Sequence, residues 1–138
     1  MKNHHKRKDL KFGLKKEKEV LELLKSRYGE KTIKQNSKYS TFDFETVDGS
    51  IQWELKSRRC SSKTYPTMML SYHKLRKAQD DLGKKKSIIL FNLRDGLFEW
   101  EYDPDGFELD IGGTTRRNCD ERHLCAYIPI TSLRRFQL

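Results

Sequence analysis

Three charged side chains are spaced so that they would meet on one face of a β-hairpin. Two segments of alternating side-chain character flank Asp48-Gly49, the dipeptide that most favours a two-residue hairpin turn. Such a turn places Asp43 directly opposite Glu54, with Cβ atoms about 4.5–5.5 Å apart. Lys56 follows Glu54 by two positions, so its ammonium group would extend over the same surface. The spacing therefore predicts a carboxylate pair with a lysine beside it.

A carboxylate pair of this kind is suited to a divalent cation. Two acids directly opposite each other repel, and this repulsion destabilises a sheet unless a positive group compensates it. Hard divalent cations prefer oxygen ligands, which such a pair supplies. The alternation leaves the other face of the hairpin apolar, and we expect that face to belong to the core: Phe42, Phe44, Thr46, Ile51, Trp53 and Leu55.

A third carboxylate comes from an amphipathic helix predicted over residues 10–28. At about 100° of rotation per residue, Val20, Leu24 and Tyr28 form one apolar stripe, and Glu17 lies within it. An acid in an apolar stripe costs free energy unless it is paired or binds a cation. We therefore expect Glu17 to reach inward towards the same site.

These acids also have simpler interpretations, which the sequence leaves open. Asp43 and Glu54 could flank Lys56 in a surface salt-bridge cluster without any function. Glu17 could pair with a lysine or arginine elsewhere in the chain. The functional interpretation is favoured because one helix and two strands supply the three acids independently.

Composition favours a polyanionic partner and gives no sign of a membrane span. The chain has 138 residues, with 29 Lys and Arg against 20 Asp and Glu, a net charge of +9. Its longest uninterrupted apolar run, residues 88–91, is far shorter than the roughly 20 residues that a spanning helix needs. The basic N-terminus is not followed by the apolar stretch of a secretory signal, and three cysteines suit a reducing compartment. We expect an intracellular protein, in cytoplasm or nucleus.

The remaining pattern predicts a disordered basic arm over residues 1–9 and one domain over residues 10–138. After the first helix, a second helix is expected over residues 71–82, where Ser71 could cap its start. The predicted strands cover residues 31–35, 42–47, 50–57, 87–93, 97–102, 107–111 and 124–130. The fold class is therefore α/β (α+β), with a mixed β-sheet flanked by helices and a C-terminal β-hairpin.

Three segments together resemble the signature of the PD-(D/E)XK nuclease superfamily: Gly13-Leu14-Lys15-Lys16-Glu17, Phe42-Asp43 and Glu54-Leu55-Lys56. The resemblance covers about two-thirds of the chain, to about residue 102, and implies a restriction-endonuclease-like αβββαβ core. The spacing is also similar to that of archaeal Holliday-junction resolvases and of short nucleases carried by phages and large DNA viruses. Phe42 stands where the superfamily's name has proline, and the C-terminal hairpin is not part of the common core.

The resemblance implies a metal-dependent deoxyribonuclease, more specifically a structure-selective endonuclease, acting on duplex or branched DNA. Asp43, Glu54 and the backbone carbonyl of Leu55 would bind Mg²⁺, with Mn²⁺ as a substitute and Glu17 as a further ligand. Lys56 would orient the attacking water or stabilise the charged phosphate. A homodimer would supply two sites. The alternatives are a catalytically inactive nucleic-acid-binding module of the same fold and an RNA-processing nuclease.

Further candidate residues lie on the second helix and in basic loops. Gln79 falls on the predicted inward face, where superfamily members often carry a polar residue that assists the site; a buried amide bonded to backbone is the alternative. The residues expected to contact DNA are Lys38, Arg58, Arg59, Lys63, Lys74, Arg116 and Arg117. The spacing of Cys119, His123 and Cys125 matches no common zinc finger.

Overall fold

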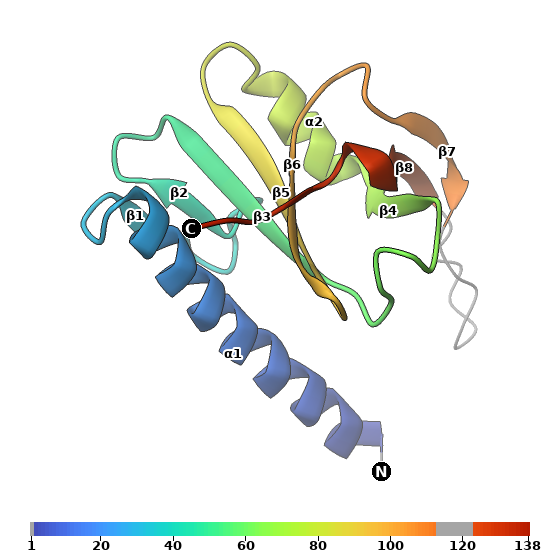
Figure 1. Ribbon diagram of the computed structural model, residues 1–138, viewed down its shortest axis with the longest axis horizontal. Coiled ribbons are helices and arrows are strands. Elements are labelled where there is room, and N and C mark those ends of the chain that lie inside the picture. Colours follow the sequence, from blue (N-terminus) through green and yellow to red (C-terminus); the bar gives the residue numbers. More distant parts are fainter. Residues whose placement is uncertain (1, 113–122) are drawn as a thin grey trace.

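The computed structural model describes the backbone of residues 2–112 and 123–138 and the side chains of residues 15–112 and 123–138. Within these residues the chain forms two α-helices and two β-sheets (Figure 1). The elements in chain order are α1 (Lys2–Tyr28), β1 (Ile33–Gln35), β2 (Phe44–Thr46), β3 (Ile51–Ser57), β4 (Thr67–Ser71), α2 (Tyr72–Asp80), β5 (Lys86–Leu93), β6 (Gly96–Glu101), β7 (Glu108–Gly112), β8 (His123–Pro129), the short 3₁₀-helix η2 (Ile130–Ser132) and β9 (Arg134–Arg135).

The main sheet is mixed, with strand order β1-β2-β3-β5-β6-β9. Only the central pair β3–β5 is parallel among the pairs described, and the chain passes through β4 and α2 between these two strands. The apolar run 88–91 lies in β5 and is fully buried, as expected for a strand covered on both faces. The predicted α+β class with a mixed sheet and flanking helices is confirmed.

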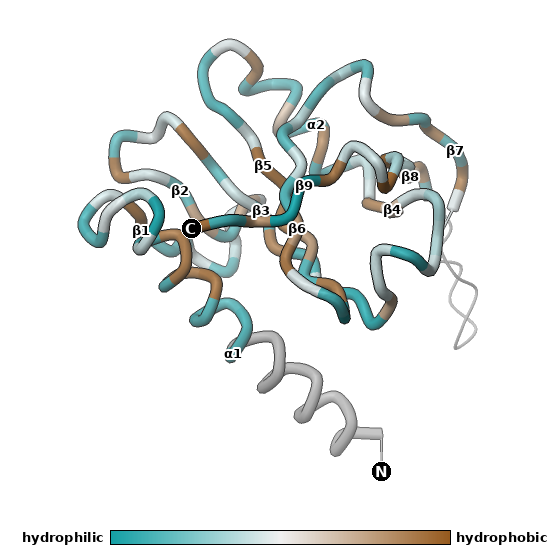
Figure 2. Tube along the Cα trace, viewed as in Figure 1, coloured by the Kyte–Doolittle hydropathy of each residue, from teal (hydrophilic) through white to brown (hydrophobic). Residues whose placement is uncertain are grey.

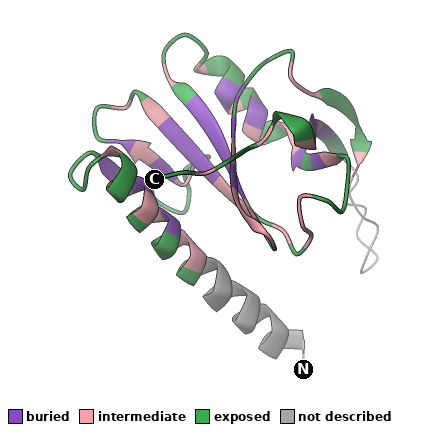
Figure 3. Cartoon of the chain, in the orientation of Figure 1, coloured by how far each residue is buried: buried purple, intermediate pink, exposed green. Residues whose placement is uncertain are grey.

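Each face of the main sheet packs against a different helix. Val20 and Leu24 of α1 pack with Phe44 and Trp53 in one cluster, on the same face as Leu90. A second cluster joins Leu75 and Ala78 of α2 to alternate residues of β5, Ile89 and Phe91. Figure 3 shows buried residues along β3 and β5, and Figure 2 shows that those of β5 are mostly hydrophobic. These two clusters fix the central strands β3 and β5, and with them the side chains that these strands carry.

Helix α1 ends where the sequence predicted and begins earlier. Gly29 follows Tyr28 with φ 112°, a conformation that glycine adopts without steric cost, and its N–H donates to the Lys25 carbonyl (2.8 Å). The helix starts at Lys2, so residues 2–9 of the segment 1–9, which was expected to be a disordered arm, are helical backbone. Apolar periodicity detects only the part of a helix that packs on a core, and it therefore gave no sign of this N-terminal extension. None of the described helices has the length and apolar character needed to cross a membrane.

A second, three-stranded sheet has the order β4-β8-β7. The predicted C-terminal hairpin corresponds to β7 and β8, which pair antiparallel. Strand β4 was not predicted, because residues 58–67 were interpreted as a loop leading directly to the second helix. Its Met68 and Leu70 are buried with Ala126 and Ile128 of β8, against the α2 side of the main sheet. The short strand β9 was also not predicted.

Candidate active site

The β2–β3 hairpin has the predicted register, interrupted by a β-bulge at Asp43. Phe44 pairs with Trp53, as a turn at Asp48-Gly49 requires, and Gly49 has φ 77°. The N–H of Asp43 also donates to the Trp53 carbonyl (2.9 Å). Two consecutive residues thus oppose one, which is the definition of a bulge. Asp43 therefore does not continue the regular ladder. The prediction that it lies directly opposite Glu54 was wrong.

The bulge shifts the alternation of side chains by one residue. Phe42 was expected to share a core face with Phe44 and Trp53. Instead it is buried in the cluster on the α2 side, whereas Phe44 and Trp53 pack beneath α1. The expectation failed because a bulge adds a residue to one strand, so side chains beyond it point to the other face. Glu54 pairs with Ile89, a member of the α2-side cluster, so Phe42 and Glu54 lie on the same face.

The bulge also places the Asp43 carboxylate beside the other two acids. Its Oδ2 accepts a hydrogen bond from the backbone N–H of Leu55 (2.8 Å), which fixes the carboxylate against β3. Its negative charge helps to raise the pKa of Glu54 and that of Glu17. Asp43 is therefore within electrostatic reach of both other acids, although the backbone route differs from the one predicted.

Glu54 is the buried acid of the three, and only one of its two carboxylate oxygens has a described partner. It is 3% exposed, and its Oε1 contacts the ammonium groups of Lys74 (3.3 Å) and Lys56 (3.4 Å). Among the described residues, its Oε2 has no hydrogen-bond partner although it is buried. Burial, followed by the charge of Asp43, raises the pKa of Glu54 to about 7 against the opposing effect of the lysines. Glu54 therefore pairs with both lysines, as the simpler interpretation expected, but it does so in a buried position and with one oxygen that has no described partner.

Glu17 faces the site from α1, one turn before the buried Val20. Its Oε2 accepts a hydrogen bond from Nε2 of Gln35 in β1 (3.2 Å). Partial burial raises its pKa, and the charge of Asp43 raises it further, while the bond from Gln35 acts in the opposite direction. Because Glu17 is half-buried rather than enclosed, it belongs to the edge of the acidic group.

Helix α2 supplies Lys74 to the site and does not supply Gln79. Lys74 was predicted to contact DNA; its Nζ donates to the Thr41 carbonyl (2.7 Å) and pairs with Glu54. Gln79 is exposed, and its Oε1 accepts a hydrogen bond from the Tyr102 hydroxyl (2.6 Å). No contact between Gln79 and the acids is described, so the expected assisting role has no structural support. Gln79 lies more than one turn beyond Lys74, away from the end of the helix that meets the acids.

His73 is a neighbour of the site that sequence reasoning missed. Burial lowers its pKa, and the positive charges of Lys74 and Lys56 lower it further, with a smaller contribution from His123. His73 therefore lies within electrostatic reach of the two lysines that pair with Glu54 and of His123 in β8. The signal that could have identified His73 is its position directly before Lys74 at the start of a predicted helix.

The other predicted DNA contacts lie farther along the surface. Arg58 is half-buried; its guanidinium donates to the carbonyls of Met69 (3.2 Å) and Ser57 (3.3 Å), and burial lowers its pKa. The exposed members of the predicted set are Lys38, Arg59 and Lys63. Two further predicted contacts, together with Cys119, lie outside the described residues: Arg116 and Arg117.

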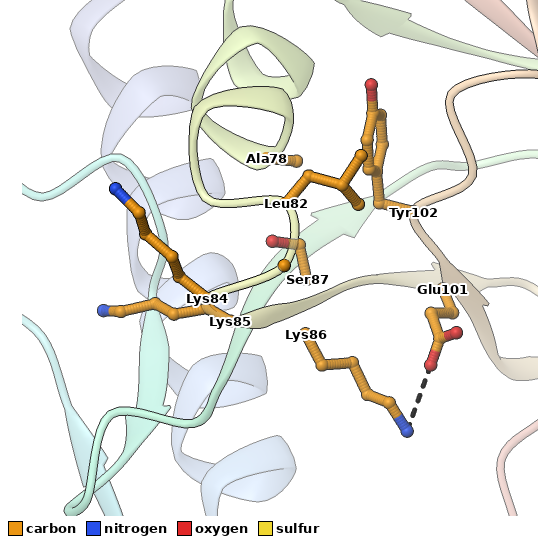
Figure 4. A pocket seen from close by; sticks show the side chains of 9 residues that line it. Ala78, Leu82, Lys84, Lys85, Lys86, Ser87, Glu101 and Tyr102 are labelled. Atoms are coloured by element: carbon orange, nitrogen blue, oxygen red, sulfur yellow. Dashed lines mark ion pairs between the residues drawn. The ribbon is translucent and has the colours of Figure 1, made fainter.

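A cavity of about 310 Å³ at the end of α2 is separate from the acidic group. Ala78, Leu82 and Tyr102 line it together with lysines of the segment 84–86. Figure 4 shows the ammonium groups of Lys84 and Lys85 pointing away from Tyr102, and that of Lys86 pointing to Glu101, with which it forms an ion pair (3.0 Å). The ammonium groups of these lysines therefore do not converge on Tyr102.

The acids do not form a complete protein cage for a metal ion. Across residues 15–112 and 123–138, no three His, Cys, Asp or Glu side chains are arranged to hold an ion. Mg²⁺ does not require such a cage, because it is usually bound by one or two carboxylates and completes its shell with waters and substrate oxygens. The unpartnered Oε2 of Glu54 beside Asp43 fits that mode of binding.

Fold and site together define an α+β protein in which a buried acid, paired with two lysines, lies beside a bulged strand that carries a second acid. Searches of protein-family models, curated proteins and solved structures found no match to this chain. The functional interpretation therefore depends on the residues and contacts described above.

Proposed function

We propose that this chain is a metal-dependent deoxyribonuclease, a structure-selective endonuclease of the PD-(D/E)XK type. The observation that carries the proposal is the environment of Glu54: a buried carboxylate with one unpartnered oxygen, two lysines on the other oxygen, and a second acid within electrostatic reach. The order α1, β1, β2, β3, α2, β5, with β3 parallel to β5, supports it, since this is the αβββαβ arrangement with one strand inserted. The net charge of +9 favours a polyanionic substrate.

The residues divide into ligands of the ion and groups that act on the phosphate. Asp43, Glu54 and the backbone carbonyl of Leu55 would hold Mg²⁺ or Mn²⁺, with Glu17 acting directly or through water. When bound, the ion would polarise the phosphate and make a nearby water more acidic. Lys56 would orient that water or offset negative charge that develops on the phosphate oxygens during hydrolysis.

Lys74 has a different role in the proposal. Its ammonium group is anchored by the Thr41 carbonyl and occupies Oε1 of Glu54, so Oε2 is the oxygen left for the ion. Two lysines beside one acid also reduce the repulsion between Glu54 and Asp43 before any ion binds. Lys74 therefore keeps the acid pair close enough together to act as one site.

A cleavage assay with matched variants tests the proposal. Supercoiled plasmid, linear duplex and a labelled four-way junction are incubated with Mg²⁺, Mn²⁺ or EDTA. We expect metal-dependent cleavage, lost in Lys56→Ala while DNA binding is retained, and retained in Lys34→Ala. Lys34 is a suitable control because it is an exposed lysine of the same sheet whose ion pair is with Glu45 (3.4 Å). Cleavage mapping of the junction against the duplex measures structure selectivity.

A second candidate is a nucleic-acid-binding module that does not cleave. The favouring observation is that Lys56 and Lys74 already neutralise Glu54, so the fold could tolerate this acid without any metal. Binding without cleavage under every metal condition would support that module. Comparison of RNA with DNA substrates in the same assay separates the third interpretation, an RNA-processing nuclease.

A further inference from the structure

A cavity of about 360 Å³ opens beside β4 and the segment 58–66 that precedes it. Its lining is mostly apolar and aromatic and includes Tyr65, Met69 and Tyr127, with Arg58 and Cys60 as the polarisable or charged members. Tyr65 is 58% exposed and Met69 41% exposed, so large apolar side chains face solvent here without a protein partner to cover them. Exposed apolar groups gathered around a cavity indicate a binding site more often than chance exposure.

Two features fix the walls of this cavity. Met69 and Tyr127 are cross-strand neighbours in the β4–β8 ladder, so their side chains lie on the same face. A Cβ atom at Gly112 would collide with the Tyr127 hydroxyl, so the glycine in β7 gives this ring its room. On the other wall, the two bonds from Arg58 to the Met69 and Ser57 carbonyls hold the guanidinium in one orientation. The cavity is therefore bounded on one side by paired residues of the β4–β8 ladder and on the other by a hydrogen-bonded guanidinium.

Arg58, which lines the cavity, follows Lys56 of the candidate active site by two residues. The backbone N–H of Arg58 donates to the Asn92 carbonyl (3.0 Å), so the line of β3 continues past its last residue. Along an extended chain, Lys56 and Arg58 project on the same side about 6.6 Å apart. B-form DNA rises about 3.4 Å per nucleotide along its axis, and the backbone path between consecutive phosphates is longer, so this spacing spans one to two nucleotides. A strand whose phosphate lies at Lys56 would thus bring a neighbouring nucleotide to the cavity.

We propose that this cavity receives one unpaired nucleobase of the DNA strand that is cut, one or two nucleotides from the scissile phosphate. The proposal rests on the proposed function and adds the basis of its structure selectivity. Aromatic rings and a thioether offer flat, polarisable contacts to any base, and a guanidinium that makes two bonds to carbonyls has further N–H donors for base acceptors. Intact duplex would supply such a base only after unstacking, whereas a branch or mismatch supplies it at lower cost.

The charge around the cavity favours a nucleotide over an apolar protein segment. Arg58 forms part of the wall, and the exposed Arg59 and Lys63 belong to the same short segment of chain. A partner inserted here must carry negative charge next to a flat apolar group, and a nucleotide carries both. The volume also suits a single ring system, since it lies near the lower limit of small-ligand sites, about 300 Å³.

Binding of DNA with and without the base tests this proposal in EDTA, so that cleavage plays no part. The probe is a duplex with one unpaired nucleotide, compared with the same duplex carrying an abasic residue at that position. We expect the abasic duplex to bind about fivefold to a hundredfold more weakly, the range for loss of one stacked base. Tyr65→Ala should remove most of this discrimination and Tyr65→Phe should retain it. Tyr39→Ala is the aromatic control, because Tyr39 is 87% exposed and does not line the cavity.

The outcomes separate this proposal from the proposed function. Equal binding of the two duplexes by the wild-type protein, or unchanged discrimination in Tyr65→Ala, overturns the base pocket even if metal-dependent cleavage is found. Discrimination that depends on Tyr65, in a protein that cleaves nothing with Mg²⁺ or Mn²⁺, supports the pocket and rejects the nuclease. Gly112→Ala gives a second measurement, because crowding the Tyr127 ring should weaken discrimination without removing any side chain from the cavity.

Discussion

Substitution of Glu54 by glutamine should change how the stability of the protein depends on pH. The folded protein holds the Glu54 proton with a pKa of about 7, whereas the ordinary pKa of a glutamate is 4.5, so losing this proton destabilises the fold. The stabilising contribution of the protonated acid is complete below about pH 4.5 and is lost as the pH rises through about 7. The difference between these two pKa values corresponds to about 3 kcal/mol of folding free energy. Most of this loss, about 2 to 3 kcal/mol, falls between about pH 5 and pH 8.

Urea unfolding in EDTA over that pH range measures the effect. We expect the unfolding free energy of wild type to fall with increasing pH relative to that of Glu54→Gln, which keeps the shape of the side chain and has no charge to lose. Parallel pH profiles for the two proteins would refute the reasoning. In wild type, Mg²⁺ should restore stability at the alkaline end, because an ion that binds only the folded, ionised site adds its binding free energy.

Glu45 provides a control of opposite sign on the same hairpin. Burial acts to raise its pKa, but the ion pairs with Lys85 (3.1 Å) and Lys34 (3.4 Å) outweigh burial, and the pKa is lowered. The stabilising contribution of Glu45 is therefore present at neutral pH and is lost as the pH falls through its folded pKa. At neutral pH, Glu45→Gln should therefore be less stable than wild type, whereas Glu54→Gln should be more stable than wild type.

Three further predictions follow from individual contacts. NMR titration should show His73 with a pKa below its usual 6.5, and Lys74→Met should move that pKa upward by removing a neighbouring positive charge. Gln79→Ala should leave cleavage unchanged and cost about 1 kcal/mol of stability, because it removes only the hydrogen bond from Tyr102; loss of cleavage would restore its predicted role. Leu90→Ala, at a residue with 0% exposure in the central strand, should lower the unfolding free energy by about 2–5 kcal/mol in urea titrations.

The sequence predicted those parts of the fold that local periodicity determines. Gly29 as a helix stop, the turn at Gly49 and the buried central strand all depend on the conformational preference or burial of a few adjacent residues. The contact of Lys56 with Glu54 was predicted in the same way, because two residues separated by one in a strand share a face.

The missed features depend on contacts between distant segments. Strand β4 has only Met68 and Leu70 as buried apolar residues, too few for a period to stand out, and it becomes a strand by pairing with β8, more than fifty residues later. The placement of Gln79 failed for a related reason: helical periodicity gives the direction of a side chain around the axis but not which end of the helix meets the site. Lys74, at the end that does, was predicted only as a DNA contact and not as a partner of Glu54.

The bulge at Asp43 connects these observations, because it explains how one acid can influence two others on different sides of a sheet. Glu17 belongs to α1, which packs on the Phe44 face, and Glu54 lies on the α2 face. In a regular ladder the Asp43 side chain would belong to one face only. With two residues opposite Trp53, Asp43 leaves the ladder, its carboxylate is held by the Leu55 N–H, and its charge raises the pKa of both acids. The irregularity that sequence periodicity could not detect is therefore the feature that lets the charge of Asp43 act on both Glu17 and Glu54.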